Sequence, residues 1–339
     1  MRLSELDYEL PEELIAQHPL ERRDEARMLV VDRKSRTFES SRFYKLPRHL
    51  KDGDLVVLND TRVLPARLFA RKESGGRVEL LLVRPAEHPP GAWLTLMRAH
   101  RPLKDGTRLL LDDGRALRIV SYARYGRPIV IGEDSVSIDD ILKSRGTLAL
   151  PHYIHREVDS ADFADYQTVY ASHPGAIAAP TAGLHFTDEV FKELAAAGVR
   201  TAMVTLHIGP GTFAPVREPT VEGHTMEAEW FTIPPAALEA LEHRRRIGGR
   251  VIAVGTSSTR ALESYAITRD AEGFTGLFIY PGFRFKLVDA MITNFHMPRT
   301  TVLALVMALG GRDLILAAYR EAIRHRYRFL SYGDAMLIV

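Results

Sequence analysis

The 339-residue sequence contains no cysteine, which excludes disulfide bonds and metal sites built on thiolates. This absence fits a reducing cytoplasm, where we expect the protein to be located. Long apolar runs are also missing, because the longest, Val302 to Leu309, has eight residues against the ~20 that span a bilayer. The first residues include acids and lack the apolar core of a signal peptide. We therefore expect no membrane association.

Familiar catalytic and cofactor motifs are absent as well. The sequence has no P-loop, no G-x-S-x-G elbow and no H-E-x-x-H pair. His152 and His155 lie three residues apart without companion ligands, so we predict no metal site. "HIGPGTF" contains Gly209 and Gly211, but their spacing does not match the dinucleotide fingerprint.

The composition is that of a soluble globular protein, with 46% apolar and 26% charged residues, and the length suits two domains. Charge is unevenly distributed: residues 62–150 hold 16 Lys and Arg against 10 Asp and Glu, whereas the remainder holds 29 against 33. Arginine outnumbers lysine by 37 to 8, and arginine is the better bidentate phosphate ligand. The pattern favours a phosphate-binding surface, although a general bias toward arginine explains it equally well.

Residues 62–150 consist of short extended segments separated by turns. Asp113 and Gly114 form a typical two-residue hairpin turn between two of them. Six such segments with almost no helix pattern predict a small antiparallel β-barrel or sandwich. The segments are "ARLFARK", "RVELLLVRP", "AWLTLMRAH", "TRLLLDD", "RALRIVSYA" and "RPIVIGED".

The flanking parts of the chain alternate between strand and helix patterns. Strands are predicted at 26–33, 54–60, 200–209, 250–255 and 333–339, and helices at 11–17, 187–199, 234–249, 256–267, 300–311 and 312–328. We therefore expect a mixed α/β main domain, formed by residues 1–61 and 151–339, with a small antiparallel β-barrel domain of residues 62–150 inserted into it.

Polar segments follow several of the predicted strands, where ligands usually bind in α/β sheets. "APTAGLHFT" places Gly183 and His185 just before a helix, whose free N–H groups attract anions. The imidazole suits proton transfer near neutral pH, but it could equally serve only to satisfy a backbone carbonyl. "GTSSTR" reads more simply as a helix cap than as an anion site. "TNFHMPRTT" adds Asn294 and His296 before another helix.

Together these segments resemble one enzyme family, the S-adenosylmethionine:tRNA ribosyltransferase-isomerases of queuosine biosynthesis. The resemblance runs from end to end in the same order. It rests on "NDTRVLPARL", "YQTVYA", "AAPTAGLHFT", "VTLHIGPGTF", "AVGTSSTRALES", "YPGFRFKLVDAMITNFHMP" and "YRFLSYGDAML".

The resemblance implies a reaction in which the ribosyl group of S-adenosylmethionine, rather than its methyl group, is transferred and isomerised. S-adenosylmethionine is then a consumed co-substrate, and no true cofactor is expected. The acceptor is the 7-aminomethyl-7-deazaguanine at the wobble position of a tRNA with a GUN-type anticodon. The products are epoxyqueuosine-tRNA, adenine and methionine. The family fold, an α/β domain with an inserted β-barrel, matches the division inferred above, and we expect a monomer.

This chemistry needs proton transfers, because the sulfonium acidifies the C5′ hydrogens and adenine leaves more readily when protonated. We expect the catalytic groups to be His185, His207, His296 and Asp60, with the acid and the base unassigned. The expected substrate-binding residues are Thr181, Gly183, Gly209, Gly211, Thr212, Thr256, Arg260 and Asn294.

Several positions depart from the family pattern, and "GTSSTR" varies mildly from the usual "GTTSVR". Ala149 and His152 replace usual prolines, Glu227 replaces a common histidine, and Leu330 replaces a frequent phenylalanine. Two other classes remain as alternatives. An S-adenosylmethionine-dependent RNA methyltransferase would need a glycine-rich turn after an early strand, which we do not find. A non-catalytic tRNA-binding protein would not need several polar loops at strand ends.

Overall fold

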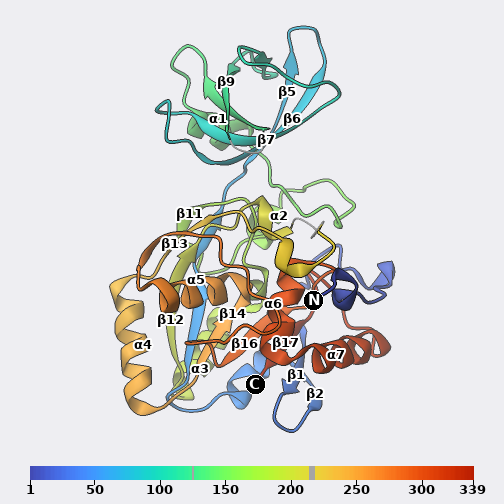
Figure 1. The fold of residues 1–339 in the computed structure, drawn as a ribbon, viewed down its shortest axis with the longest axis vertical. Coiled ribbons are helices and arrows are strands. Elements are labelled where there is room, and N and C mark those ends of the chain that lie inside the picture. The colour runs from blue at the N-terminus through green and yellow to red at the C-terminus, as the bar shows by residue number, and fades with distance from the viewer. Residues whose placement is uncertain (124–125, 214–217) are drawn as a thin grey trace.

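The structure is a computed structural model and describes residues 1–123, 126–213 and 218–339. A small β-barrel stands on a larger α/β body, and both chain termini lie in the larger body (Figure 1). The predicted fold class, a mixed α/β domain carrying an inserted antiparallel β-barrel, is confirmed. The strands of the barrel occupy residues 67–132. Boundaries at residues 62 and 150 stay a prediction.

Nine described strands form the sheet of the main body, in the order β15-β13-β12-β3-β14-β16-β17-β1-β2. Four central strands run parallel to one another, since β3 pairs in parallel with β12 and β14, and β14 with β16. The strands are β1 (Arg27–Asp32), β2 (Thr37–Arg42), β3 (Leu55–Asn59), β12 (Arg200–Leu206), β13 (Glu229–Thr232), β14 (Val251–Val254), β15 (Glu272–Thr275), β16 (Ala290–Asn294) and β17 (Ala335–Ile338).

Alternate residues of each strand face opposite sides of the sheet, and each side is covered differently. Ile252 and Val254 of β14 pack with Val190 of a helix, whereas Val251 and Ala253 pack on the other side. Helices α4 (Pro235–Ile247), α5 (Gly255–Thr268), α6 (Thr301–Gly310) and α7 (Arg312–Arg324) cover one side, and α3 (Asp188–Ala196) with the 3-10 helix η4 (Phe43–His49) covers the other.

Most predicted elements agree with the structure, and the exceptions have physical reasons. The helix expected at 11–17 is only a single 3-10 turn, η2 (Glu12–Leu14), because Ile15 already forms a β-bridge with Phe329. In the nine-stranded sheet, β2, β13, β15 and β16 were not predicted. The first three lie at the two ends of the sheet, where one neighbour or none is a long apolar strand. Strand β16 is central and fully buried, but its short sequence "AMITN" ends in two polar residues and has no clear strand pattern.

The barrel is closed, with strand order β10-β7-β6-β5-β8-β9. All six predicted segments form its strands: β5 (Arg67–Lys72), β6 (Arg77–Pro85), β7 (Trp93–Ala99), β8 (Arg108–Leu110), β9 (Ala116–Ala123) and β10 (Arg127–Gly132). Inward-facing apolar residues alternate along them, as Val78, Leu80 and Leu82 do in β6. Helix α1 (Ile138–Arg145), which was not predicted, packs Ile138 and Ile141 against this core.

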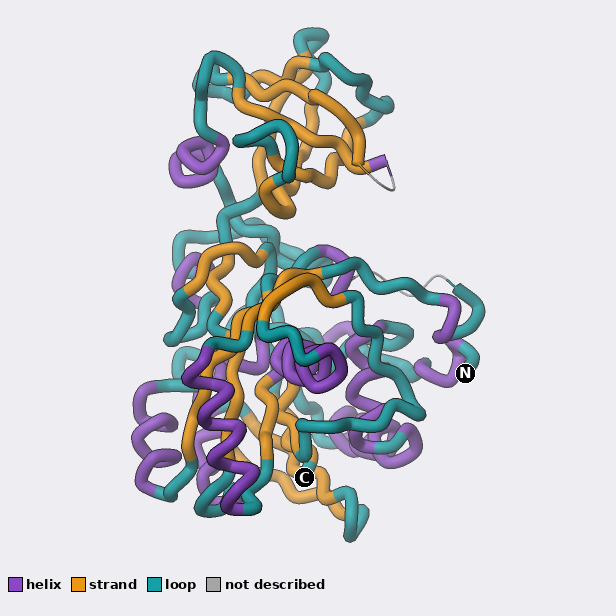
Figure 2. Tube along the Cα trace, turned by 60° about the vertical axis from the view of Figure 1, so that its left-hand side comes forward, coloured by secondary structure: helices purple, strands orange, loops and turns teal. Residues whose placement is uncertain are grey.

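Few segments join the barrel to the main body (Figure 2). The outgoing chain passes through β4 (Thr61–Val63), which pairs in parallel with β11 (His173–Ala176) of the main body. The returning chain forms a bridge between Thr147 and Arg67. Arg127 of β10 forms an ion pair with Glu227, which belongs to the main body. The connection is therefore narrow and includes a salt-sensitive contact.

The lengths and apolar character of the helices bear on whether any of them could span a membrane. Among the described residues, no single helix combines the length and apolar character of a membrane span. Helices α6 and α7 meet these criteria only as a pair, and a bend of 111° separates them.

Glu263 of α5 provides a test of this fold. The side chain is fully buried, and its two carboxylate oxygens accept the backbone N–H groups of Lys286, Leu287 and Val288 at 2.9 Å. Each buried donor left unpaired costs about 1–3 kcal/mol. We expect Glu263→Ala to lower the free energy of unfolding in urea by about 3 kcal/mol or more. The exposed Glu239 of α4 is the matched control, and Glu239→Ala should change stability by less than about 0.5 kcal/mol. Equal effects would contradict this role.

Candidate functional site

Two adjoining cavities lie beyond the carboxyl ends of the parallel strands. The smaller, the Asn294 pocket, has a volume of about 80 Å³ and is lined by the starts of α5 and α6, the end of β16 and the 3-10 helix η6 (Thr181–His185). The larger, the interdomain cleft, has a volume of about 1000 Å³ and lies between the barrel and the main body. Ile208 and Met226 line both cavities. A shared wall therefore separates a small compartment from a large one.

The Asn59 side chain holds the strand ends that position both cavities. Its Nδ2 donates to the Leu206 carbonyl oxygen at 2.9 Å and to Ser257 Oγ at 3.0 Å. Its Oδ1 accepts the N–H groups of Thr61 and Leu206 at 3.1 and 3.0 Å. This buried amide thus donates two hydrogen bonds and accepts two, and these bonds link β3, β12 and α5.

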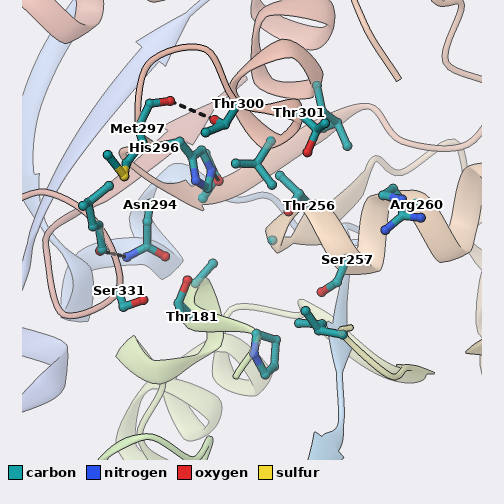
Figure 3. A pocket seen from close by; sticks show the side chains of 18 of the residues that line it. Thr181, Thr256, Ser257, Arg260, Asn294, His296, Met297, Thr300, Thr301 and Ser331 are labelled. Atoms are coloured by element: carbon teal, nitrogen blue, oxygen red, sulfur yellow. Dashed lines mark hydrogen bonds between the residues drawn. The ribbon is translucent and has the colours of Figure 1, made fainter. Parts of the chain in front are cut away.

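Polar and apolar side chains both line the Asn294 pocket (Figure 3). The side-chain oxygen of Asn294 points into the space near Thr181 and Thr256, while its side-chain nitrogen points the other way. Asn294 is 2% exposed and Thr301 3% exposed, yet Asn294 Oδ1 and Thr301 Oγ1 have no hydrogen-bond partner among the described residues. Buried polar atoms are nearly always paired, so these two atoms mark a place for a ligand.

The two threonines at the start of α6 have different roles. Thr300 is the N-cap: its hydroxyl accepts the N–H of Leu303 at 3.4 Å and donates to the Met297 carbonyl at 2.8 Å. Thr301 follows inside the helix with its hydroxyl unused. Thr301 was not among the expected site residues, although it belongs to the segment "TNFHMPRTT".

His296 lines the Asn294 pocket and is fixed from several sides. Its Nε2 lies 2.8 Å from Thr293 Oγ1, its backbone N–H donates to the Tyr319 hydroxyl at 2.9 Å, and its carbonyl accepts from the Tyr8 hydroxyl. Burial lowers the pKa of His296 to about 4. The ring is therefore neutral at physiological pH and does not supply an imidazolium acid there.

His185 lies behind the Asn294 pocket rather than in it. Its ring packs against Phe43 with centroids 5.0 Å apart, and its Nε2 lies 3.3 Å from Asn294 Nδ2. Burial lowers the pKa of His185 to about 4, and a hydrogen bond to the Arg23 backbone opposes this shift only in part. The Nδ2 of Asn294 can only donate, so a neutral His185 ring takes part in this contact by accepting at Nε2.

Gly183 is explained by packing. A Cβ at this position would lie 2.0 Å from the Tyr170 hydroxyl and 2.9 Å from Thr168 Cγ2, so no larger residue fits. Gly183 does not line either cavity. Thr181, two residues earlier in η6, does line the Asn294 pocket.

His207 faces the interdomain cleft. It stacks on Trp230 with centroids 5.0 Å apart, and its Nδ1 lies 2.8 Å from Thr61 Oγ1. Gly175 lets the backbone approach the ring, because a Cβ there would lie 2.5 Å from His207 Nε2. Burial lowers the pKa of His207, and the neighbouring His173 lowers it further.

Asp60 is buried beside this group. It accepts from the Thr205 hydroxyl at 2.6 Å, and its second oxygen lies 3.1 Å from Nδ1 of His173. His173 is largely exposed and was not among the expected site residues, since nothing in "SHPGA" marks it out. The four expected catalytic residues are therefore divided: His296 lines the pocket, His207 lines the cleft, and His185 and Asp60 lie behind them.

The remaining expected residues differ in where they lie. Arg260 lines the Asn294 pocket but forms a buried ion pair with Glu229, which lines the cleft. Gly209 lines the cleft and donates its N–H to Glu229 Oε1 at 2.7 Å. A Cβ on Gly211 would lie 3.0 Å from Cβ of Glu227. The side chain of Thr212 lies outside the described residues, and Thr256 lines the pocket.

Three of the named departures from the family pattern also line these cavities: His152 and Leu330 line the Asn294 pocket, and Glu227 lines the cleft. The ring of His152 lies edge-on to Tyr153. Glu227 pairs with Arg127 of the barrel. Across the described parts of the chain, no group of three or more His, Asp or Glu is arranged to hold a metal ion.

The comparisons with known proteins all indicate the same family. The chain matches the family of queuosine biosynthesis proteins over residues 3–338 and belongs to that family. A relative from Rubrobacter xylanophilus is 49% identical over 100% of this chain and 98% of its own length. One from Halothermothrix orenii is 46% identical over all of both chains. Both are named S-adenosylmethionine:tRNA ribosyltransferase-isomerase.

A solved structure is also similar. The crystal structure of S-adenosylmethionine tRNA ribosyltransferase from Thermotoga maritima is 37% identical and covers 99% of this chain and 100% of its own, with a TM-score of 0.57.

The low pKa of His185 predicts a stability loss in acid. The folded ring has a pKa of about 4 against an ordinary 6.5, so the unfolded chain binds the proton first as the pH falls. Stability is therefore lost between pH 6.5 and 4, by on the order of 2 kcal/mol at pH 5 from this group. We expect His185→Gln to reduce by that amount the difference between urea unfolding free energies at pH 7.5 and pH 5. An unchanged difference would show that His185 is not buried in its neutral form.

Proposed function

We propose that this protein transfers the ribosyl group of S-adenosylmethionine to tRNA and isomerises it. The observation that carries the proposal is the full-length identity of 46–49% with relatives named for this reaction. The geometry supports it, because a two-substrate enzyme needs a compartment for the small donor and an open cleft for the nucleic acid. The Asn294 pocket and the interdomain cleft provide these, with only a shared wall between them.

The acceptor is the 7-aminomethyl-7-deazaguanine at the tRNA wobble position, in tRNAs with a GUN-type anticodon. A new bond forms between the amine nitrogen, which loses a proton, and the carbon skeleton of the ribose. The C5′–S bond to methionine and the glycosidic bond to adenine break, and methionine and adenine leave as the ribose rearranges. No further cofactor takes part, and the protein works as a cytoplasmic monomer. These finer points rest on the motif resemblance.

The proposed site contains two groups of residues. Thr181, Thr256, Asn294 and His296 contact the donor in the Asn294 pocket, with His185 behind them, and Arg260 joins the pocket to the cleft. In the cleft, Gly209, Gly211 and Thr212 let the backbone approach the substrates. Gly183 contributes through packing against Tyr170.

His207 is the proposed proton acceptor of the cleft, with Asp60 and His173 beside it. The lowered pKa of His207 keeps the ring neutral at physiological pH, as a base requires. His185 and His296 are less suited, because bases with a pKa of about 4 are weak.

Product analysis tests the function. Wild-type protein with S-adenosylmethionine and tRNA carrying the aminomethyl base should release adenine and methionine in equal amounts. The same tRNA with guanine at the wobble position lacks the attacking amine and should release neither. S-adenosylhomocysteine would instead indicate a methyltransferase, and binding without any product would indicate a non-catalytic tRNA-binding protein.

Substitution of His207 tests the assignment of the base. We expect His207→Asn to lower kcat by about 10²–10⁴-fold, the usual contribution of general base catalysis. Because the neutral ring is the active form, wild-type kcat/KM should fall only below pH 6.5, and this acidic limb should disappear in the variant. His100→Asn, at an exposed position on the barrel, is the matched control and should retain wild-type turnover. A variant at His207 with wild-type kcat would exclude the role.

A further inference from the structure

Asn294 differs from the other asparagine of the chain in one respect. The sequence contains two asparagines, Asn59 and Asn294, and both are buried. The Asn59 oxygen accepts two backbone N–H groups, whereas the Asn294 oxygen accepts none from the described residues. An unpaired buried acceptor costs about 1–3 kcal/mol unless a ligand completes it.

The orientation of the Asn294 amide is fixed by its neighbours. Nδ2 donates to the Leu330 carbonyl oxygen at 3.1 Å, and this oxygen can only accept. Leu330 has φ 71, a left-handed conformation that residues with a side chain seldom adopt, and it aims this carbonyl at the amide. The second N–H points to the bare Nε2 of His185 at 3.3 Å. Rotating the amide by 180° would place its oxygen against the Leu330 carbonyl oxygen, which cannot donate, so Oδ1 stays turned into the pocket.

The pocket therefore requires a hydrogen-bond donor on its ligand, and its lining favours an uncharged one. No Asp or Glu is among the described residues that line it, and Arg260 is paired with Glu229. His296 is neutral. An ammonium or sulfonium group would lie here without a counter-charge, which is costly in a buried site. Apolar side chains fill much of the remaining wall, which suits a flat heteroaromatic ring.

We propose that the Asn294 pocket binds the adenine of S-adenosylmethionine, with the 6-amino group donating to Asn294 Oδ1. His185 is a positioning residue that holds the amide in this orientation, and the Thr301 hydroxyl is available to a ring nitrogen. The inference rests on the proposed function, since adenine belongs to the donor. The 7-aminomethyl-7-deazaguanine of the tRNA fits the Asn294 pocket less well, because its aminomethyl group is cationic. It is also attached to a tRNA, which needs the larger interdomain cleft.

The test compares donors with and without the amino group. We expect wild-type kcat/KM to be about 10- to 100-fold lower for the S-adenosylmethionine analogue in which purine replaces adenine. Equilibrium dialysis without tRNA should show a similar preference for adenosine over purine riboside. In Asn294→Ala the preference should fall to within about 3-fold, because the acceptor is gone. His185→Ala should reduce it partially, and His185→Gln, which restores an acceptor, should recover it.

Thr95→Ala is the matched control, since it removes a buried side-chain hydrogen bond inside the barrel, to the Pro128 carbonyl at 2.9 Å, and Thr95 lines neither cavity. This variant should lose stability but keep the wild-type preference for the amino group. An equal preference in wild type and Asn294→Ala, or no preference in wild type, overturns the inference. If adenine release continues in that case, the proposed function survives. If wild type releases no adenine and binds neither nucleoside, both fail.

Discussion

The carboxamide of Asn59 is the interaction on which the arrangement of the site depends. Parallel strands β3 and β12 separate at their carboxyl ends, and their last backbone groups lose ladder partners there. Asn59 supplies four hydrogen bonds at this point and reaches Ser257 at the start of α5. One side chain thus fixes the exits of two strands and the entry of a helix. The exit of β12 lines both the pocket and the cleft, and the start of α5 lines the pocket.

Much of the fold could be predicted because its determinants are local. Alternating apolar residues and turn residues predict the barrel strands, and capping residues with helical periodicity predict the helices of the main body. Strand β2, with the sequence "TFESSR", has no such pattern, because an edge strand with mostly exposed residues is defined by backbone pairing with β1. Helix α1 is short and its mean hydropathy is low, so its three buried residues did not stand out.

The site could be predicted as a set of segments but not as a set of roles. The turn at 179–187 does border the pocket, yet His185 faces away from it and Gly183 serves Tyr170. Which way a side chain points depends on packing between distant elements.

The charge pattern of the sequence also does not show which charges are paired in the fold. The basic excess of the barrel segment is partly neutralised within the barrel, where Arg108 and Arg118 share Glu133, and Arg115 and Arg145 share Asp113.

The fixed amide of Asn294 also bears on the chemical durability of the protein. Asparagine is among the thermolabile residues, and its slow hydrolysis exchanges an NH₂ group for an oxygen. At Asn294 the aspartate formed would face the Leu330 carbonyl, which cannot donate, and Nε2 of His185, which donates only if it carries a proton. Replacing this one nitrogen by oxygen hardly changes the shape or the mass of the protein. It would nevertheless remove the hydrogen bond to the Leu330 carbonyl that fixes the orientation of the side chain.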